Sequence, residues 1–183
     1  PESKEARAKS EYPRDIIIRK PELEHAPDIR LPAGRINDFI QATELICKAN
    51  GIQDLIKTLL NIILGQLKAT HAWCALRDEP EGPMVYQDGK KRNGSVLLLS
   101  EIAINQKVTE AIGKKEFVLL PKISSSQEKE VIQSAMIVPI IDPTGCFGVM
   151  YAANSVKDED YSLSDLDYLM LLAIHTAAIL ENF

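Results

Sequence analysis

The sequence SAMIVPIIDPTGCFGVMYAAN, residues 134–154, decides the fold of this chain. It contains two apolar runs, residues 135–141 and 146–153, on either side of Asp142-Pro-Thr-Gly145. Short apolar runs bounded by turn residues are typical of β-strands. Pro and Gly occupy the positions of the connection that a type I turn favours. The segment therefore predicts two strands joined as a hairpin.

A terminal helix is predicted after the hairpin, because Ser162-x-x-Asp165 has the spacing of a capping box. Two apolar seams run along this helix, which therefore has to be covered from more than one side. We expect the sheet and the first helices on one side, and a partner chain or a continuing coiled coil on the other. The alternative is a helix that is fully buried within the domain. The first seam consists of Leu166, Leu169, Ala173, Thr176, Leu180 and Phe183, and the second of Tyr168, Leu171, Leu172, Ile174, Ala178 and Ile179.

Two helices and two strands are predicted near the start of the domain. Apolar residues at three- and four-residue steps indicate helices over residues 36–47 and 52–67, separated by Asn50-Gly51. Alternating apolar residues indicate a strand over residues 71–77. After a turn rich in Pro and Gly, residues 84–87 predict a short returning strand.

The middle of the chain is less regular. Ser100 and Ser125 stand where a serine side chain can cap a helix, the second with Glu128 at capping-box spacing. The predicted elements are a polar loop over residues 88–94, an apolar run over 95–99, a helix from Ser100 to Gly113, a strand over 117–120 and a short helix from Ser125 to about residue 133.

The first 35 residues differ from the rest of the chain. They hold five of the ten prolines, and their 8 basic and 7 acidic side chains give a net charge of +1, which leaves −6 for the other 148 residues. Only Ile16-Ile17-Ile18 is apolar enough to dock on the domain, as an edge strand. We therefore expect a charged, proline-rich linker or extension over residues 1–35 and one domain over residues 36–183.

Composition excludes several classes of protein. The chain has 183 residues, of which 45% are hydrophobic and 26% charged, and a net charge of −5, which fits one soluble domain and is a poor fit to nucleic-acid binding. Cys47, Cys74 and Cys146 form no CxxC pair, which favours a reducing compartment. No signal peptide opens the sequence, and no apolar run approaches 18 residues. We expect a cytoplasmic protein without a membrane partner.

Taken together, these motifs resemble the GAF family of sensory domains. The resemblance implies an α+β sandwich, related to PAS domains, with a central antiparallel sheet of five or six strands. The N- and C-terminal helices are expected on one face, with short helices and loops over a small-molecule pocket on the other. The residues that carry the resemblance are Ser134-Ala-Met-Ile-Val-Pro139-Ile, the turn Asp142–Gly145, Phe147-Gly148-Val149-Met-Tyr151-Ala-Ala-Asn154, Tyr161-Ser-x-x-Asp165-Leu166, residues 55–76 and, more weakly, residues 100–120.

The resemblance also implies a class of function. Such domains usually regulate a kinase, a cyclase, a phosphodiesterase or a transcription activator, and they commonly dimerise through the first and last helices. We therefore expect a non-catalytic sensory module, homodimeric and covalently attached to signalling domains, although the fold alone does not give its ligand. One alternative is a pure dimerisation module whose pocket is filled by side chains, and another is a free methionine sulfoxide reductase.

The enzymatic alternative depends on cysteines. The reductase of this family uses clustered, redox-active cysteines in the pocket loops. Here Cys47 falls in the first helix, Cys74 in the first strand and Cys146 at the hairpin, and none lies in the variable middle. A reactive thiolate also needs nearby positive charge, which these contexts lack. No other catalytic motif is present, so we expect no catalytic residues.

The cyclic-nucleotide motif of the family is matched only in part. Asn154, Lys157, Tyr161 and Asp165 approximate it, but Lys157 is displaced and Leu166 replaces the final Glu. These residues are more simply explained as strand and helix ends, so cyclic-nucleotide binding is possible but unsupported.

Other cofactors of the family have no signature here. Bilin-binding members need a cysteine followed by histidine, a pair that this sequence lacks. We expect His25, His71 and His175 to have structural or surface roles rather than to bind haem, and we predict no metal site. The cofactor, if there is one, stays unidentified.

A pocket on the sheet needs an apolar wall and a few polar groups that converge on it. Strand parity alone does not decide whether Trp73 or Cys74 faces the pocket. The serines at 124–126 could offer hydroxyl and amide groups to an anionic ligand at a helix start, or they could only cap that helix. The candidate ligand-binding residues are Trp73 or Cys74, Met136, Val138 and Met150 from the strands, and the polar residues Arg77, Ser100, Ser124, Ser125 and Ser126.

Overall fold

The computed structural model describes residues 16–21, 29, 31–121, 132–155 and 158–183. These residues form a six-stranded sheet in which every pair of neighbouring strands is antiparallel, in the order β1-β4-β5-β6-β2-β3. The strands are β1 (Ile17–Arg19), β2 (His71–Leu76), β3 (Tyr86–Lys91), β4 (Phe117–Leu120), β5 (Ile132–Asp142) and β6 (Gly145–Ser155).

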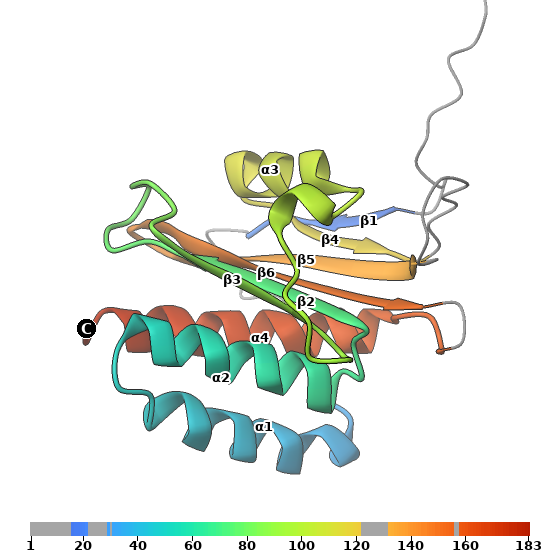
Figure 1. Ribbon diagram of the computed structural model, residues 1–183. Coiled ribbons are helices and arrows are strands. Elements are labelled where there is room, and N and C mark those ends of the chain that lie inside the picture. Colours follow the sequence, from blue (N-terminus) through green and yellow to red (C-terminus); the bar gives the residue numbers. More distant parts are fainter. Residues whose placement is uncertain (1–15, 22–28, 30, 122–131, 156–157) are drawn as a thin grey trace, which may run out of the picture.

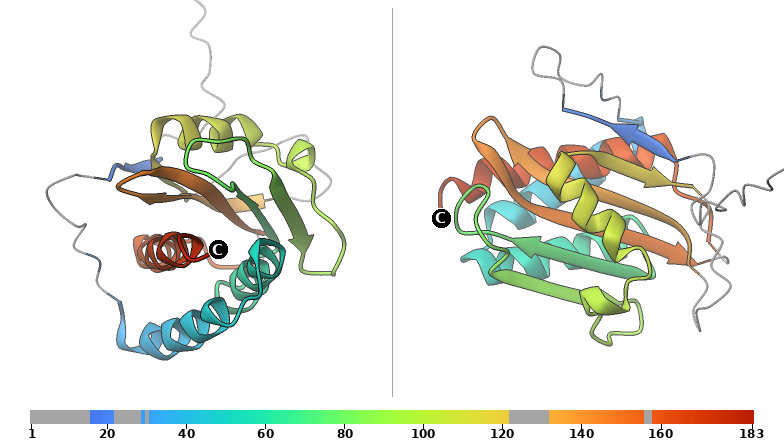
Figure 2. Two further views of the ribbon diagram at one scale, coloured as in Figure 1. Left: turned by 90° about the vertical axis from the view of Figure 1, so that its left-hand side faces the viewer. Right: turned by 90° about the horizontal axis from the view of Figure 1, so that it is seen from above.

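Helices cover both faces of the sheet (Figure 1). The long helices α1 (Ala33–Cys47), α2 (Ile52–Gln66) and α4 (Leu163–Leu180) lie on one face. The short helix α3 (Asn105–Lys114) and the 3₁₀ turn η1 (Leu99–Glu101) lie on the other. Figure 2 (left) shows that α4 lies between the sheet and α1. The predicted α+β architecture, with its terminal helices on one face, is confirmed.

The β5–β6 hairpin is the centre of this architecture. Ten of the eleven residues of β6 are buried, so both faces of the strand are covered. Alternate side chains of β6 enter two separate cores, Met150 and Ala152 under the long helices and Val149 and Tyr151 under α3. At the turn, the Asp142 carboxylate accepts hydrogen bonds from the backbone N–H and the hydroxyl of Thr144, both at 2.6 Å. The hairpin predicted from the sequence is confirmed and is longer than expected.

The predicted capping box opens α4. The Ser162 hydroxyl accepts a hydrogen bond from the backbone N–H of Asp165, and the Asp165 carboxylate accepts one from the Ser162 N–H at 2.9 Å. Arg35 of α1 also donates to that carboxylate, at 2.8 Å, which ties α1 to the first turn of α4.

By length and composition alone α4 could cross a membrane, but 10 of its 18 residues are buried in this domain.

The middle of the chain departs from the prediction in two places. Residues 88–91, predicted as a loop, continue β3 along the edge of β2. The expected helix from Ser100 to Gly113 is wrong at both ends: Ser100 lies in η1, the helix begins at Asn105, and the left-handed residue after it is Lys115 (φ 54°). The predicted short helix beginning at Ser125 lies outside the described residues, and its expected end near residue 133 falls in β5.

The edge strand predicted at Ile16–Ile18 is present as β1. Ile18 pairs with Val118 of β4, so the first part of the chain contributes the outermost strand of the sheet. The Arg19 guanidinium pairs with the Asp167 carboxylate of α4, which fastens this edge to the helical layer.

Gly148 allows β6 and β2 to approach closely, because it has no Cβ. Replacing it tests whether the two strands pack as described. A Cβ at this position would overlap the Ala75 carbonyl oxygen and lie 2.8 Å from Leu76 Cδ2. We expect Gly148→Ala to lower the free energy of unfolding by about 1–3 kcal/mol, because a paired backbone atom has to move. Chemical denaturation of the purified domain measures this difference.

Gly65→Ala is the matched control. Gly65 lies in α2, and a Cβ there would meet no atom within 4 Å. This substitution is expected to raise the stability by about 0.5–1 kcal/mol, because alanine has the higher helix propensity. Equal effects of the two substitutions would contradict the packing described here.

Candidate functional site

A groove of about 440 Å³ lies on the α3 side of the sheet, beside the edge strand β3. Its floor is formed by β2 and β3, and its rim by the segment that leads from β3 to η1. The volume falls in the range of small-molecule sites. The groove is lined by Trp73, Gln87, Asp88, Gly89, Val96, Leu97, Leu98, Leu99 and Ser100.

The segment that forms the rim of the groove crosses closely over β3 at Gly89. Gly89 pairs with Trp73 across the sheet, and its carbonyl accepts a hydrogen bond from the Leu97 N–H at 3.0 Å. A Cβ on Gly89 would overlap the Leu97 carbonyl oxygen, so only glycine allows the chain to cross here. The crossing buries Leu97 to 1% exposure and leaves its neighbours Val96 and Leu98 64% and 57% exposed.

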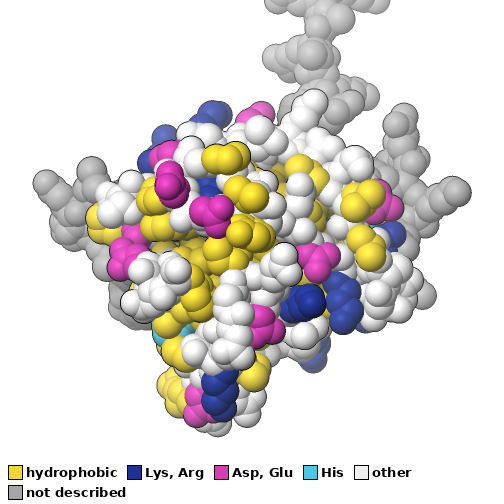
Figure 3. Space-filling model, turned by 60° about the vertical axis from the view of Figure 1, so that its left-hand side comes forward, with side chains coloured by type: hydrophobic (Ala, Val, Ile, Leu, Met, Phe, Trp, Pro, Cys, Tyr) yellow, Lys and Arg dark blue, Asp and Glu magenta, His cyan; other side chains and the backbone are white. Residues whose placement is uncertain are grey.

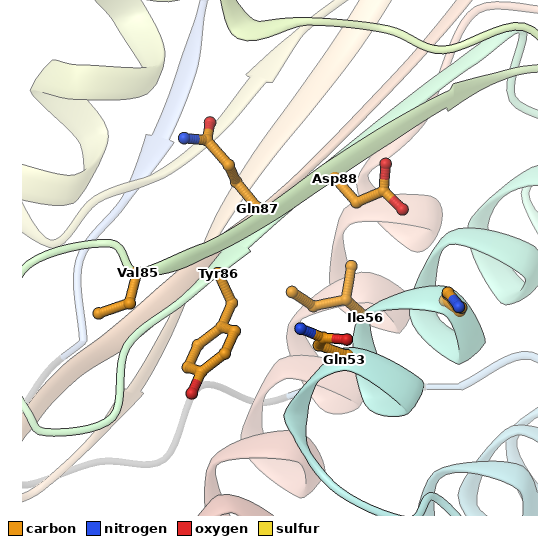
Figure 4. Close-up of a pocket in the computed structure, with 7 residues that line it drawn as sticks. Gln53, Ile56, Val85, Tyr86, Gln87 and Asp88 are labelled. Atoms are coloured by element: carbon orange, nitrogen blue, oxygen red, sulfur yellow. The ribbon is translucent and has the colours of Figure 1, made fainter.

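The chemistry of the groove is largely apolar, with polar groups at its ends. Trp73 and Leu97 form a buried wall, while Ser100 is exposed at the far side. In Figure 4, Gln87 points away from α2, whereas Tyr86 and Asp88 lie on the α2 side of β3. The amide of Gln87 and the hydroxyl of Ser100 are therefore the uncharged groups available to orient a ligand.

A second, smaller hollow lies on the other side of β3. It has a volume of about 200 Å³, and Gln53, Ile56 and Lys57 of α2 line it together with residues 85–88 (Figure 4). The Asp78 carboxylate raises the pKa of Tyr86 by its charge and by accepting a hydrogen bond. This volume is below the usual range of small-molecule sites, so the groove beside Trp73 is the stronger candidate.

The structure brings together two of the residues predicted from the sequence. Trp73 and Ser100 both line the groove, and of the two alternatives Trp73 and Cys74 it is Trp73 that lies on this face of the sheet. The expectation that the other strand residues face the middle segment needs correction. Cys74, Met136, Val138 and Met150 point to the opposite face and are fully buried in the core under the long helices.

The remaining predicted polar residues lie elsewhere. The Arg77 guanidinium donates to the Cys146 carbonyl at 2.9 Å and lies 3.8 Å from the Glu81 carboxylate, so it holds the loop after β2 against the hairpin. Ser124, Ser125 and Ser126 lie outside the described residues.

Several groove residues were not predicted. Gly89 was missed because residues 88–94 were assigned to a loop, and Val96 and Leu98 because the apolar run over residues 95–99 was not assigned to the pocket. A glycine within an alternating strand pattern signals close approach of another backbone segment. Once β3 is extended to Lys91, Gly89 gives that signal in this sequence.

The residues that approximate the cyclic-nucleotide motif join the ends of β5, β6 and α4. The Ser134 hydroxyl donates to the Asn154 side chain, whose amide donates to the Glu159 carbonyl at 2.6 Å. The Tyr161 hydroxyl donates to the Leu67 carbonyl at 3.1 Å. These buried contacts account for Asn154 and Tyr161 without a ligand, and Lys157 lies outside the described residues.

All three cysteines are described, and none lines the groove. Cys74 and Cys146 are buried, and Cys47 is exposed at the end of α1. Burial raises the pKa of the Cys74 thiol, and the nearby Asp88 carboxylate raises it further. Burial likewise raises the pKa of Cys146. A raised pKa keeps a thiol protonated and unreactive at neutral pH.

A second surface runs along one side of α1 and α4. We call it the α1–α4 flank; it consists of Ile36, Ile40, Cys47, Leu171, Ile174, His175 and Ala178. Ile36, Ile40 and Ile174 are 48–50% exposed. Figure 2 (left) shows that α1 and α2 leave one side of α4 without a described helix against it. Phe183, which follows α4, is 52% exposed. Figure 3 shows hydrophobic side chains gathered on the side of the molecule where the chain ends.

Comparisons with solved structures give the fold. The chain matches the GAF domain of an Acinetobacter phosphoenolpyruvate-protein phosphotransferase, with a TM-score of 0.57 and 15% identity over 83% of this chain and 95% of that one. The GAF domain of the Coxiella burnetii phosphoenolpyruvate-protein phosphotransferase (ptsP) matches with a TM-score of 0.54 and 14% identity, over 80% and 92% of the two chains. The chain has the GAF fold that the sequence predicted.

An enzyme is also among the structural neighbours. Free methionine-R-sulfoxide reductase from Neisseria meningitidis, solved with its substrate, matches with a TM-score of 0.54 and 12% identity, over 86% of this chain and 96% of that one. No protein-family model matches the sequence, and no curated protein matches it significantly. At these identities the likeness shows the fold alone.

The burial of the cysteines predicts very different reactivities. In the metal-free monomer we expect a thiol reagent to modify Cys47 rapidly, and Cys74 and Cys146 at least about 100-fold more slowly, because a core thiol reacts only when the structure opens. Mass spectrometry of the native protein after timed labelling measures the three rates. Unfolded protein, in which all three should react alike, is the control. Rapid modification of Cys74 or Cys146 in the native protein would contradict this placement.

Proposed function

We propose that this chain is a non-catalytic sensory or regulatory GAF module that binds a small molecule in the groove beside Trp73. The observation that carries the proposal is the groove itself, a hollow of small-molecule size floored by β2 and β3 and rimmed by the segment that crosses β3 at Gly89. We further propose that it belongs to a cytoplasmic, multidomain signalling protein whose attached domain it regulates. Its net charge of −5 favours neither nucleic acid nor anionic lipid as a partner.

The lining of the groove suggests the chemistry of the ligand. Trp73, Val96 and Leu98 offer aromatic and aliphatic contacts, and Gln87 and Ser100 offer hydrogen bonds without charge. This set favours a flat or partly apolar molecule with one polar end. Charged lining residues are limited to Asp88, whose side chain lies on the α2 side of β3 (Figure 4).

A ligand screen tests the proposal. Trp73 is the one tryptophan of the chain and is 3% exposed, so its fluorescence reports occupation of the groove. We expect a metabolite at about 100 times its Kd to stabilise the domain by about 2.7 kcal/mol and to change the Trp73 emission. Thermal shift and fluorescence titration with nucleotides, amino acids and other metabolites provide the two measurements.

Two substitutions locate the binding. Leu98→Asp places a charge at the rim and is expected to weaken binding at least about tenfold, because an apolar contact is replaced by a desolvated carboxylate. Leu163→Asp is the matched control, since Leu163 is an exposed leucine (43%) at the start of α4. Equal losses with both variants, or no stabilising ligand in the whole screen, would favour a module that serves only for dimerisation.

We propose in addition that two copies associate through the α1–α4 flank. The flank combines half-exposed isoleucines from the two helices, and an isologous dimer would cover both helices at once. None of the seven residues that define the flank is Lys, Arg, Asp or Glu, and depletion of charge is typical of the centre of a homodimer interface. This association holds for either version of the module, with or without a ligand.

The proposed dimer predicts a contrast between two residues of one helix. Ile40 is 50% exposed on the flank, and Leu45 is 51% exposed on a different side of α1. We expect Ile40→Glu to weaken the dimer at least about tenfold, because a charge would be buried, and Leu45→Glu to leave it unchanged. Analytical ultracentrifugation over a concentration series measures the dissociation constants. A wild-type protein that stays monomeric at high micromolar concentration, in metal-free and in metal-containing buffer, would refute the dimer.

A reductase activity is not part of the proposal. One structural neighbour is such an enzyme, but the groove of this chain has no thiol among its lining residues. Two of the three cysteines are buried with raised pKa, and the third lies on the α1–α4 flank, on the opposite side of the sheet. Thiol chemistry in the groove therefore has no group to perform it.

A further inference from the structure

Two metal-binding side chains meet on the α1–α4 flank. Cys47 Sγ, at the end of α1, lies 3.7 Å from His175 Nε2 of α4. Cys47 is exposed and His175 is partly exposed, so both donor atoms are accessible from outside the domain. The pair is 128 residues apart in the sequence and exists only because α1 packs on α4.

The separation suits a shared metal ion. Zinc binds thiolate at about 2.3 Å and imidazole nitrogen at about 2.0–2.1 Å, and its four ligands are arranged tetrahedrally. Two neighbouring S and N ligands of one zinc are then about 3.6 Å apart. The 3.7 Å between Cys47 Sγ and His175 Nε2 matches this distance, so little movement of either helix is needed.

The histidine ring is held in place by its surroundings. Phe39 of α1 packs edge-on against the imidazole, with 6.4 Å between the ring centroids. Ile174 and Ala178 flank His175 on the exposed side of α4, so the pair sits among apolar side chains. The contact with Phe39 orients the imidazole, and an oriented ligand ring favours metal binding.

One chain supplies only half of a structural zinc site. The described residues contain no group of three or more His, Cys, Asp or Glu side chains that could hold a metal. Two copies related by a twofold axis near Cys47 would bring together two thiolates and two imidazoles, a Cys₂His₂ set. We propose that the dimer binds one zinc ion, or a related soft divalent ion, between Cys47 and His175 of both copies. This inference rests on the proposed dimer and names the metal that would stabilise it.

Cobalt(II) and zinc provide the test. The purified domain, kept reduced with a phosphine so that no disulfide forms, is titrated with Co²⁺ while the visible spectrum is recorded. We expect the strong bands of tetrahedral, thiolate-bound cobalt, at one metal per two chains. Zinc at about 100 times its own dissociation constant should lower the dimer dissociation constant about 100-fold, if it binds only the dimer. Sedimentation with and without zinc measures this change.

Three variants assign the ligands. Cys47→Ser and His175→Gln should each abolish the cobalt bands and the effect of zinc on dimerisation. Cys146→Ser, which removes a buried thiol, should leave both unchanged. Bands that persist in His175→Gln, or one metal per chain with no change in dimerisation, would overturn the proposal.

The outcomes also separate this inference from the dimer on which it rests. A wild-type protein that dimerises but binds neither metal overturns the zinc site alone. A protein that stays monomeric with and without zinc overturns the dimer and the zinc site together. The groove ligand is unaffected by either result, because the groove lies on the other face of the sheet.

Discussion

The architecture depends on the burial of the β5–β6 hairpin on both faces. Side chains of a strand alternate between the two faces, so a doubly buried strand needs a separate apolar layer on each side. One layer is formed by α1, α2 and α4, and the other by α3 with the segment from residue 95 to η1. Gly148 allows β2 to approach β6 closely enough to extend both layers to the neighbouring strand. The groove lies at the margin of the α3 layer, and the α1–α4 flank is the outer side of the layer of long helices.

The groove lies where the thinner layer ends. Over β5 and β6 the sheet is covered by α3, a helix with a continuous apolar side that seals the surface. Over β2 and β3 the cover is a single extended segment, in which Leu97 is buried and Leu99 partly buried while Val96 and Leu98 remain exposed. An extended segment covers less of a sheet than a helix does, so space is left beside Trp73. The groove therefore lies where the cover provided by α3 ends.

Sequence patterns identified most of the elements but did not assign the strand faces. The helices over residues 33–47 and 52–66, the central hairpin and the capping box of α4 all have strong local signals, and they are where periodicity placed them. Met136, Val138 and Met150 were assigned to the wrong face because doubly buried strands carry no alternation of polar and apolar residues. Ser100 was a plausible cap by residue type, yet the helix begins five residues later, at Asn105. No side chain caps the helix at that point. Of the groove residues, Trp73 and Ser100 were among those named from the sequence. The crossing of residue 97 over Gly89 could be predicted only by knowing that β3 extends to Lys91.

The two candidate sites lie on opposite faces of the sheet, and β2 connects them. Trp73 faces the groove, and Cys74, the next residue, is packed into the core that contains α4. A single strand therefore contributes neighbouring side chains to both layers and is shared by the surroundings of both candidate sites. Cys47 and His175 belong to different helices, and a metal held by both would fix α1 against α4. The proposed dimer, built on the α1–α4 flank, would then join its two chains through one rigid pair of helices from each.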